Sequence, residues 1–278
     1  LYFKINVASD AYYLSDFSQK STSTYDNQLV NELLLSDQLQ RGQWTVLFQG
    51  YQTLHQINLP VLYDQYYRLP QLDYSSNFPN VWHNAGVGWD SQFVNFVFLG
   101  GVTPADSKST GLRWHARPYV IYPVQVGGVR IVPQLYLDAI AYQAKLPAVT
   151  PGAVRQQVDQ GRLLPIFSVS ASRVLQRAFH WGVRQFWQTL VPKIQYTFVP
   201  FTKQDNNPNF DSSTIPFSYS QVFTLNSFSG LDRLQNTSQV SLGLESQVLR
   251  QTDGSPILTA GIGAVNYWQQ RRVCLSTG

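Results

Sequence analysis

The stretch SFSGLDRLQNTSQVSLGLESQVL, residues 227–249, joins two different patterns. Its second half alternates between aliphatic side chains and small or polar ones: Val240, Leu242 and Leu244 against Ser241, Gly243 and Glu245. Such alternation is typical of a strand with one apolar face. Its first half sets Asp232 beside Arg233, between two leucines and just before that strand. An account of this strand therefore also has to explain why an acidic and a basic residue directly precede it.

The composition favours a protein with one face in lipid. Of 278 residues, 44% are hydrophobic and 13% are charged, and this charged share is about half of that in an ordinary soluble domain. A soluble protein so poor in charge would tend to associate with its neighbours. The net charge is only +4, and the basic residues are scattered without a basic stripe. Nothing therefore indicates a nucleic-acid partner.

Strand patterns dominate the chain, and helical periodicity is almost absent. We expect strands at 43–49, 93–99, 112–124, 129–142, 164–174, 191–199, 239–249 and 257–268, and weaker candidates at 2–8, 29–39, 71–77, 81–89 and 218–225. Several match the about 9 to 11 residues with which a tilted strand crosses a bilayer. No apolar run approaches the about 18 to 20 residues of a transmembrane helix.

Along these strands an apolar face opposes a polar one. In residues 112–122 the polar face carries Arg113, His115 and Arg117. In residues 129–141 it carries Arg130, Gln134, Tyr136 and Asp138, and in residues 191–199 it carries Lys193, Gln195 and Thr197. The apolar faces would meet lipid, and the polar faces would meet water or a ligand.

The connections alternate between short and long. Short ones are expected at 41–42, 90–91, 125–128 and 251–255, an intermediate one at 179–189, and long ones at 56–69, 102–111, 143–162 and 201–237. Outer-membrane barrels show this alternation, with short periplasmic turns and longer extracellular loops. We therefore predict an all-β fold, an antiparallel up-and-down transmembrane β-barrel, of which this chain supplies roughly a dozen strands. The long loops, 102–111 and 201–237 among them, would cap the barrel outside, and some would fold inward.

Catalytic and metal-binding patterns are not found. The four histidines have no metal-type spacing, and no nucleophile or phosphate-loop motif occurs in a suitable context. We therefore expect no enzyme activity, no cofactor and no metal. Cys274 is the only cysteine, so a disulfide would need a partner outside this chain. The alternative is an unpaired thiol.

Four segments resemble the LptD family of lipopolysaccharide-assembly outer-membrane proteins. FSGLDRL (228–234), followed by Asn236 and QVSLGLES (239–246), resembles the family's GLDR segment. Three further segments agree in order and spacing: FKIN with ASD and YYLSDF (3–17), LVPKIQY with VPF (190–201), and GIG with YW and RRV (261–273). The resemblance covers nearly the whole chain.

The resemblance implies a function in lipopolysaccharide transport at the bacterial outer membrane. The barrel lumen would take in the sugar portion, and the lipid portion would leave sideways into the bilayer through a lateral gate. An LptE-type lipoprotein would plug the lumen, and periplasmic bridge proteins would deliver the substrate to an N-terminal jellyroll domain. Residues 1–278 resemble one segment of the barrel, so the jellyroll and the closing strands are expected outside this chain. The missing start methionine and signal peptide agree with a chain that begins within a longer precursor.

Two groups of residues are candidates for function. Those on the polar faces would line the lumen and the substrate path: Arg113, His115, Arg117, Arg130, Lys193, Gln195, Glu245 and Gln247. Ordinary hydrated lumen residues are the alternative for each. The second group, Gly230, Leu231, Asp232 and Arg233, would anchor the longest loop over the barrel through a charge-assisted bond. The alternative for Asp232 and Arg233 is a solvated charge pair.

Two other functions remain open. A general porin or receptor barrel would share the fold without any role in assembly. A soluble β-sandwich binding module would share the alternation within strands, because one of its faces is also apolar. Co-purification of a small lipoprotein, open-channel conductance and solubility without detergent would separate the three.

Overall fold

A computed structural model describes residues 1–10, 28–54, 65–99, 104, 106–148, 150, 153–182 and 184–275. Within this part of the chain, no helix has the length and apolar character needed to cross a membrane. Strands account for nearly all of the regular structure, as the alternating sequence predicts.

The described residues form a sheet of thirteen strands. The strands are β1 (Tyr2–Lys4), β2 (Gln28–Leu39), β3 (Gly42–Thr53), β4 (Tyr67–Trp82), β5 (Ala85–Val97), β6 (Thr110–Ile121), β7 (Val124–Val126), β8 (Val129–Lys145), β9 (Gln157–Ser172), β10 (Leu175–Trp181), β11 (Arg184–Val199), β12 (Thr237–Arg250) and β13 (Pro256–Tyr267). One 3₁₀ helix, η2 (Tyr219–Phe223), lies between β11 and β12.

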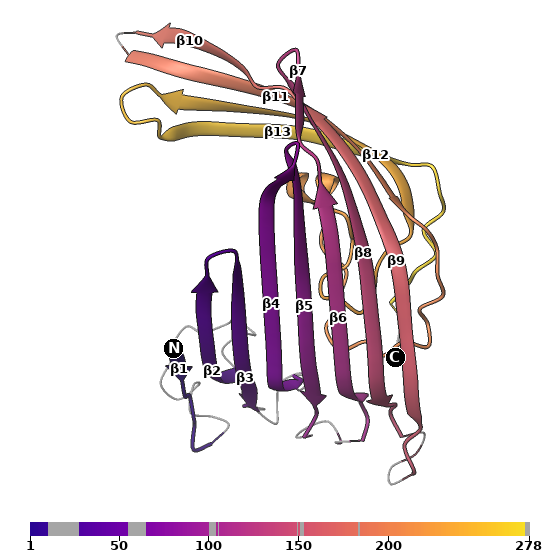
Figure 1. Ribbon diagram of the computed structural model, residues 1–278. Coiled ribbons are helices and arrows are strands. Elements are labelled where there is room, and N and C mark those ends of the chain that lie inside the picture. Colours follow the sequence, from indigo (N-terminus) through magenta and orange to yellow (C-terminus); the bar gives the residue numbers. More distant parts are fainter. Residues whose placement is uncertain are drawn as a thin grey trace.

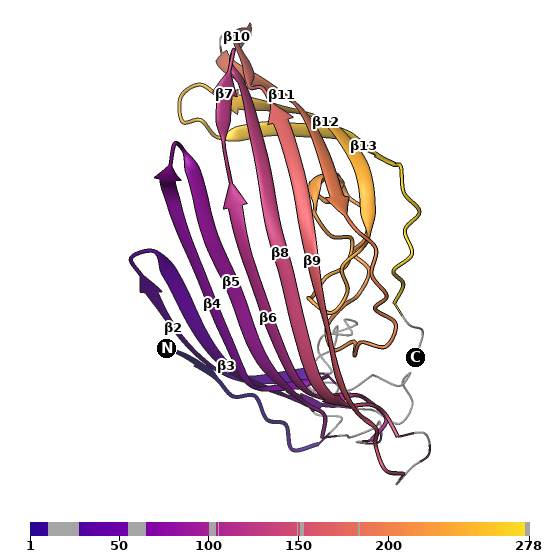
Figure 2. The same ribbon diagram turned by 45° about the vertical axis from the view of Figure 1, so that its right-hand side comes forward.

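The sheet is an up-and-down meander of antiparallel strands. The order is β1-β2-β3-β4-β5-β6-β8-β9-β11-β12-β13, while β7 pairs with β8 and β10 pairs with β11. The short connections lie at one end of the strands and the long ones at the other, and the sheet curves strongly from β1 to β13 (Figures 1 and 2). The predicted antiparallel up-and-down fold is confirmed.

Several details of the expected strand pattern are wrong. The connection expected at 179–189 is mostly strand, because β10 continues to Trp181 and β11 begins at Arg184. Residues 218–225 do not form a strand, because they contain η2. Residues 81–89 are not one strand, because the chain turns between β4 and β5 at His83 and Asn84, which have positive φ angles of 43° and 70°. The turn expected at 90–91 consequently lies inside β5.

Two long strands are interrupted where the sheet bends. β6 and β7 both pair with β8, so they form one strand broken at residues 122–123. β9 and β10 both pair with β11, and the break at residues 173–174 faces Pro192. Proline has no N–H for the ladder, so a break opposite it leaves fewer backbone groups unpaired. Beyond these breaks the ends of β10 to β13 fold across the top of Figure 1.

The two faces of the sheet have opposite character. On the outer face, apolar side chains are exposed, including Leu135 at 51%, Ile194 at 47% and Ile262 at 73%. On the inner face, Arg113 is 1% exposed and Asp138 is 3% exposed. This distribution is inverted relative to a soluble protein and is typical of a wall between lipid and a polar interior.

The connection between β11 and β12 lies inside the curve of the sheet (Figures 1 and 2). It forms two apolar contacts with the inner face. Phe210 joins a buried cluster with residues of β5 and β8, namely Val94, Phe96, Ile140, Tyr142 and Ala144. Leu234 joins Leu164, Ile166 and Val199 of β9 and β11. These clusters set the loop against the middle of the sheet.

Candidate functional site

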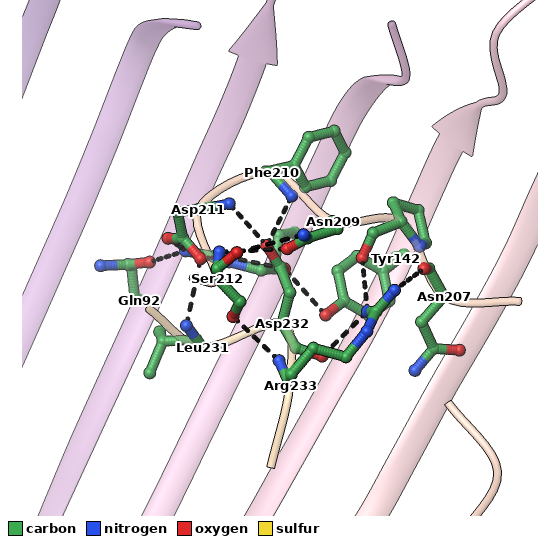
Figure 3. Close-up of polar contacts among 12 residues, drawn as sticks. Gln92, Tyr142, Asn207, Asn209, Phe210, Asp211, Ser212, Leu231, Asp232 and Arg233 are labelled. Atoms are coloured by element: carbon green, nitrogen blue, oxygen red, sulfur yellow. Dashed lines mark hydrogen bonds and ion pairs between the residues drawn. The ribbon is translucent and has the colours of Figure 1, made fainter. Parts of the chain in front are cut away.

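The candidate site is the contact between the inner face and the connection at residues 200–236, which we call the inner loop. From the sequence we expected the long loops to cap the barrel outside and some of them to fold inward. In the structure the inner loop folds back along the strands, and Asp232 and Arg233 of its GLDR segment are buried at this contact (Figure 3). Loop 102–111 lies partly outside the described residues.

Asp232 is the centre of this contact and is fully buried. Its Oδ1 accepts hydrogen bonds from Arg113 Nη1 of β6 at 2.8 Å and from Tyr142 Oη of β8 at 2.9 Å. Its Oδ2 accepts from the backbone N–H groups of Phe210 at 2.6 Å and Asp211 at 2.9 Å (Figure 3). One carboxylate thus links two strands to two parts of the inner loop.

Arg113 holds a second loop carboxylate. Its Nη1 and Nη2 donate to Asp211 Oδ1 at 2.8 Å and Oδ2 at 2.6 Å, a bidentate pair. Nη2 also donates to Gln92 Oε1 at 2.7 Å, and the guanidinium lies 4.8 Å from the centre of the Phe96 ring. A planar guanidinium is suited to such two-point recognition, which fixes orientation as well as charge.

Arg162 of β9 extends the network to the next strands. Its Nη1 donates to the Asp232 carbonyl oxygen at 2.7 Å, and its Nη2 donates to the Leu231 carbonyl oxygen at 2.8 Å. Nη2 also donates to Asp138 Oδ1 at 2.9 Å. The other oxygen of Asp138 is 2.9 Å from His115 Nε2.

Arg233 lies beside Asp232 in sequence but stabilises the inner loop itself. Its Nη1 donates to the Pro208 carbonyl oxygen at 3.0 Å, and its Nη2 donates to the Asn207 carbonyl oxygen at 2.8 Å. Three arginines, Arg113, Arg162 and Arg233, thus occur with three aspartates, Asp138, Asp211 and Asp232. The buried charges balance, which limits the cost of removing them from water.

Two constraints require glycine at position 230: its backbone conformation and the lack of room for a side chain. Its φ of +65° lies in the left-handed region, and a Cβ there would collide with the backbone and side chain of Asp211. The turn directs the Leu231 N–H to Asp211 Oδ1 at 3.1 Å. Leu231 packs against the cluster around Phe210. All four residues of the GLDR segment therefore contribute to seating the inner loop.

The two loop carboxylates have pKa values that shift in opposite directions. Burial works to raise the pKa of Asp211, but the hydrogen bonds and charge of Arg113 outweigh it and hold this pKa at about 2. Burial raises the pKa of Asp232, and the neighbouring charge of Asp211 adds to this against the effect of Arg113. Asp211 is therefore the carboxylate that the guanidinium keeps ionised most firmly.

The other predicted lumen residues share the inner face but not the network. Arg117 pairs with Asp90 at 2.9 Å, and both side chains are about one-third exposed, at 33% and 34%. Gln195 donates to the Phe223 carbonyl oxygen at 3.0 Å, and Lys193 Nζ lies 4.1 Å from the centre of the Phe223 ring. Glu245 accepts from Gln247 Nε2 at 2.8 Å, and Arg130 is exposed on β8.

Several residues of the site were not among the predictions. Arg162 was placed in a connection, although residues 160, 162, 164 and 166 continue the inner-face pattern of β9. Tyr142 and Asp138 occupy alternate positions along β8, so the alternation in the sequence places them on the inner face. No sequence pattern marked Asp211 as a site residue, because its partner Arg113 is 98 residues away in sequence.

Asn236 anchors the inner loop to the segment after β13. It is fully buried, its Nδ2 donates to the Gln270 carbonyl oxygen at 2.9 Å, and its Oδ1 accepts from Arg272 N at 2.8 Å. Cys274 lies in this segment and is an exposed free thiol. A bridge from Cys274 to a part of the protein outside this chain stays a prediction.

Among the described residues, no group of three or more His, Cys, Asp or Glu side chains is arranged to hold a metal ion. The carboxylates of the site are instead satisfied by arginine and backbone N–H groups. The arrangement therefore positions a loop and offers no reacting group.

Comparison with known proteins identifies relatives along the whole chain. The family model described as LPS transport system D, LptD, matches residues 1–278. The LPS-assembly protein LptD of Coxiella burnetii is 39% identical over 278 residues, which cover 99% of this chain and 31% of that protein. The proteins of the same name from Methylococcus capsulatus and Nitrosospira multiformis are each 32% identical and are covered over 24% and 28% of their lengths.

This chain thus spans about a third or less of these relatives. The family description is that of a transport system, in agreement with the expectation that the chain is not an enzyme. The GLDR segment that anchors the inner loop is also where the sequence resembled this family. With the family model matching from the first residue to the last, the chain belongs to the LptD family.

Proposed function

We propose that the protein containing this chain assembles lipopolysaccharide in the bacterial outer membrane, and that the sheet is part of its barrel wall. The family match supports this role. The exposed apolar outer face and the charged inner face support a wall with lipid on one side and a polar lumen on the other. Outer-membrane lipids would contact the side chains of the outer face.

The saccharide portion of the substrate would pass along the inner face. Arg130 and Lys193 both pair with Ser172 of β9, one from each side, so the two cations are separated by a single strand. Neither forms an ion pair with a described residue. Cations without a carboxylate partner attract phosphates and acidic sugars into a lumen. The lipid portion would leave sideways through a gate formed by strands outside this chain.

The inner loop would control how much of the lumen is open. The observation that carries this proposal is its burial on the inner face through Asp232, which is 0% exposed and bonded to Arg113 and Tyr142. A loop held by several buried charges rarely detaches, since each broken pair leaves an uncompensated charge. The substrate would therefore move past a seated loop.

The orientation and the partners belong to the same proposal. The long connections would face the outside of the cell and the short turns the periplasm, as in other outer-membrane barrels. An LptE-type lipoprotein would plug the part of the lumen that the inner loop leaves open. Periplasmic bridge proteins would deliver lipopolysaccharide to the jellyroll domain of the whole protein.

Depletion of the full-length protein in its host tests the proposal. We expect lipopolysaccharide to accumulate in the periplasm and to be lost from the cell surface. A plasmid copy of the wild-type gene should restore export. Normal surface lipopolysaccharide after depletion would refute the proposal. A stable open-channel conductance of the purified wild-type protein would favour a general porin instead.

A further inference from the structure

A pocket of about 300 Å³ lies between the inner loop and the inner face of β12 and β13. Its walls come from loop residues 215–227 and 235 and from the ends of both strands nearest the long connections. Figure 2 shows the inner loop running beside these two strands. The volume is at the lower end of ligand pockets, which span about 300–1,000 Å³. The pocket is separate from the aspartate–arginine network that seats the loop.

The floor of the pocket is polar, buried and hydrogen-bonded. Gln235, Thr237 and Gln239 line it and are 6%, 3% and 7% exposed. Thr237 Oγ1 donates to Gln239 Oε1 at 2.8 Å, which directs the amide group of Gln239. The Gln235 backbone N–H donates to Asn226 Oδ1 at 3.0 Å, so the floor is also tied to the loop. Amides and hydroxyls that are fixed in this way are pre-arranged to recognise hydroxyl groups.

One polar atom of the pocket has no partner in the structure. Gln221, in η2, lines the pocket, and its buried Oε1 makes no hydrogen bond. A buried acceptor without a donor costs free energy, so the amide of Gln221 has hydrogen-bonding capacity that the protein does not use. Because Gln221 comes from the inner loop, its side chain lines the pocket only while the loop is docked.

The mouth of the pocket carries an aromatic ring and a cation. Tyr267 is 39% exposed on the inner face of β13, and the Arg271 guanidinium lies 4.4 Å from the centre of its ring. Arg271 forms no ion pair with any residue that the structure describes. A sugar ring can pack on an aromatic face, and a free guanidinium binds a carboxylate or phosphate in a bidentate manner.

We propose that this pocket binds one sugar unit that carries a carboxylate or a phosphate, during passage of the substrate through the lumen. The inference rests on the proposed function and names the part of the substrate that the inner loop contacts. The amides of Gln221 and Gln239 bind the hydroxyl groups, Tyr267 packs against the ring, and Arg271 binds the anionic group. An unmodified neutral sugar would leave Arg271 without its partner.

Photocrosslinking in living cells tests the pocket on the full-length protein. Tyr267 is replaced by p-benzoylphenylalanine, and Tyr119 is replaced in the same way as a matched control. Tyr119 is another partly exposed tyrosine, on β6 and outside the pocket. After irradiation, the purified protein is probed for covalently bound lipopolysaccharide. We expect adducts at Tyr267 that fall about fivefold with Gln239→Leu, the change for one hydrogen bond, and also fall with Arg271→Gln.

The outcomes separate the pocket from the proposed function. Adducts at Tyr119 without adducts at Tyr267 would overturn the pocket and leave lumen transport intact. Adducts at Tyr267 that neither substitution lowers would overturn sugar recognition by these side chains. No adducts at either position would overturn both the pocket and the lumen path. Arg271→Gln lies on the exposed rim, so it tests binding even if Gln239→Leu impairs folding.

Discussion

Arg113 is the side chain on which the docking of the inner loop depends most. It neutralises Asp211 and Asp232 together, and it is 1% exposed. Arg113→Met would leave two loop carboxylates without their cation. We expect the docked loop to lose about 3 kcal/mol or more, the usual cost of removing one partner of a buried ion pair. Hydrogen exchange of peptides from residues 204–236 of the full-length protein measures this loss locally.

Arg117→Met is the matched control, because Arg117 lies on the same strand and face and also pairs with an aspartate. Its pair is about one-third exposed, so we expect a change below about 1 kcal/mol. Equal exchange of the inner loop in the two variants would show that the Arg113 pairs do not hold it. Arg113→Lys should fall between them, because an ammonium group cannot bind Asp211 in a bidentate manner.

The pKa of Asp211 predicts how the stability of the docked loop changes at acidic pH. Its pKa of about 2 lies below the ordinary value of 3.8, so the docked state favours its ionised form. This stabilisation is fully present above about pH 4 and is lost as the pH falls towards about 2. The pKa of Asp232 is raised, so its protonation has the opposite sign and does not add to the loss. Between Asp211 and Asp232, the decline should therefore come from Asp211.

Urea titrations of the wild type and of Asp211→Asn, between pH 5 and about 2, test this assignment. The wild type should lose about 2 kcal/mol of stability between about pH 4 and pH 2, as the shift in pKa requires. The variant should start less stable and show a smaller decline. A parallel decline in both proteins would assign the acid sensitivity to other groups.

The sequence identified the residues of the GLDR segment but not their partners. Asp232 and Arg233 look like a pair because they are adjacent, yet Asp232 pairs with Arg113, which is 119 residues away. Arg233 binds backbone carbonyl groups of its own loop. Alternation shows which face of a strand a residue occupies, whereas contacts across such distances depend on how a loop folds over that face.

At the level of elements, the inner loop acts as a packed layer although it has little regular structure. The Phe210 ring stacks on Phe96 of β5, with centres 4.3 Å apart and planes at 9°. Gln204 Nε2 donates to the Leu234 carbonyl oxygen at 2.8 Å, and its Oε1 accepts from Leu234 N at 3.0 Å. Side chains thus satisfy backbone groups that no strand ladder reaches.

Gly230 is where this layer turns towards the sheet. Gly230→Ala should destabilise the docked loop by more than about 1 kcal/mol, because it combines a left-handed backbone with a collision against Asp211. Gly254→Ala is the matched control, since Gly254 has a similar φ of +68° but no atom within 4 Å of the added Cβ. Hydrogen exchange of the inner loop should rise in the first variant and stay unchanged in the second.

The contrast between the two glycine variants isolates the collision, because both carry the same backbone strain. Equal global stability and equal loop exchange in the two proteins would mean that Asp211 moves aside and that the tight turn is not essential.

The elements that the sequence predicted well are those with a period of two. Residues 239–245 alternate strictly, and residues 239–249 form β12 within a residue or two of the expected ends. Residues 218–225 were expected to be a weak strand, yet they form η2 on the inner face. Val222 is fully buried there. A short apolar run is consistent with a strand or with any other buried segment, and here packing on the sheet decides.

For the molecule as a whole, the inner loop fills part of the concave side of a curved sheet. Alternation and the order of short and long connections predicted the meander, because both are local properties of the sequence. The filling could not be predicted in this way, since a long connection is compatible with a lid outside or a layer inside. The buried charged side chains of the inner face are the feature that indicates a covering layer, because charged side chains are rarely so deeply buried without partners.

Release of the inner loop should therefore open the lumen. We expect Arg113→Met combined with Arg162→Met to detach the loop, because the two substitutions remove every arginine hydrogen bond from the strands to Asp211, to Asp232 and to the carbonyl group of Leu231 and leave only the Tyr142 hydrogen bond to Asp232. The full-length variant, in planar bilayers, should conduct more than the wild type. Cells that carry it should admit a large polar antibiotic that the outer membrane normally excludes.

The matched control is Arg117→Met, which removes an inner-face cation but leaves every bond to the loop in place. If the double variant shows rapid hydrogen exchange of the inner loop but an unchanged conductance, the loop is detached without having blocked the lumen. The loop would then be a layer that shapes the inner face, and the obstruction would have to come from another part of the protein. An increase in conductance only in the double variant identifies the buried aspartate–arginine network as the element that keeps the channel closed.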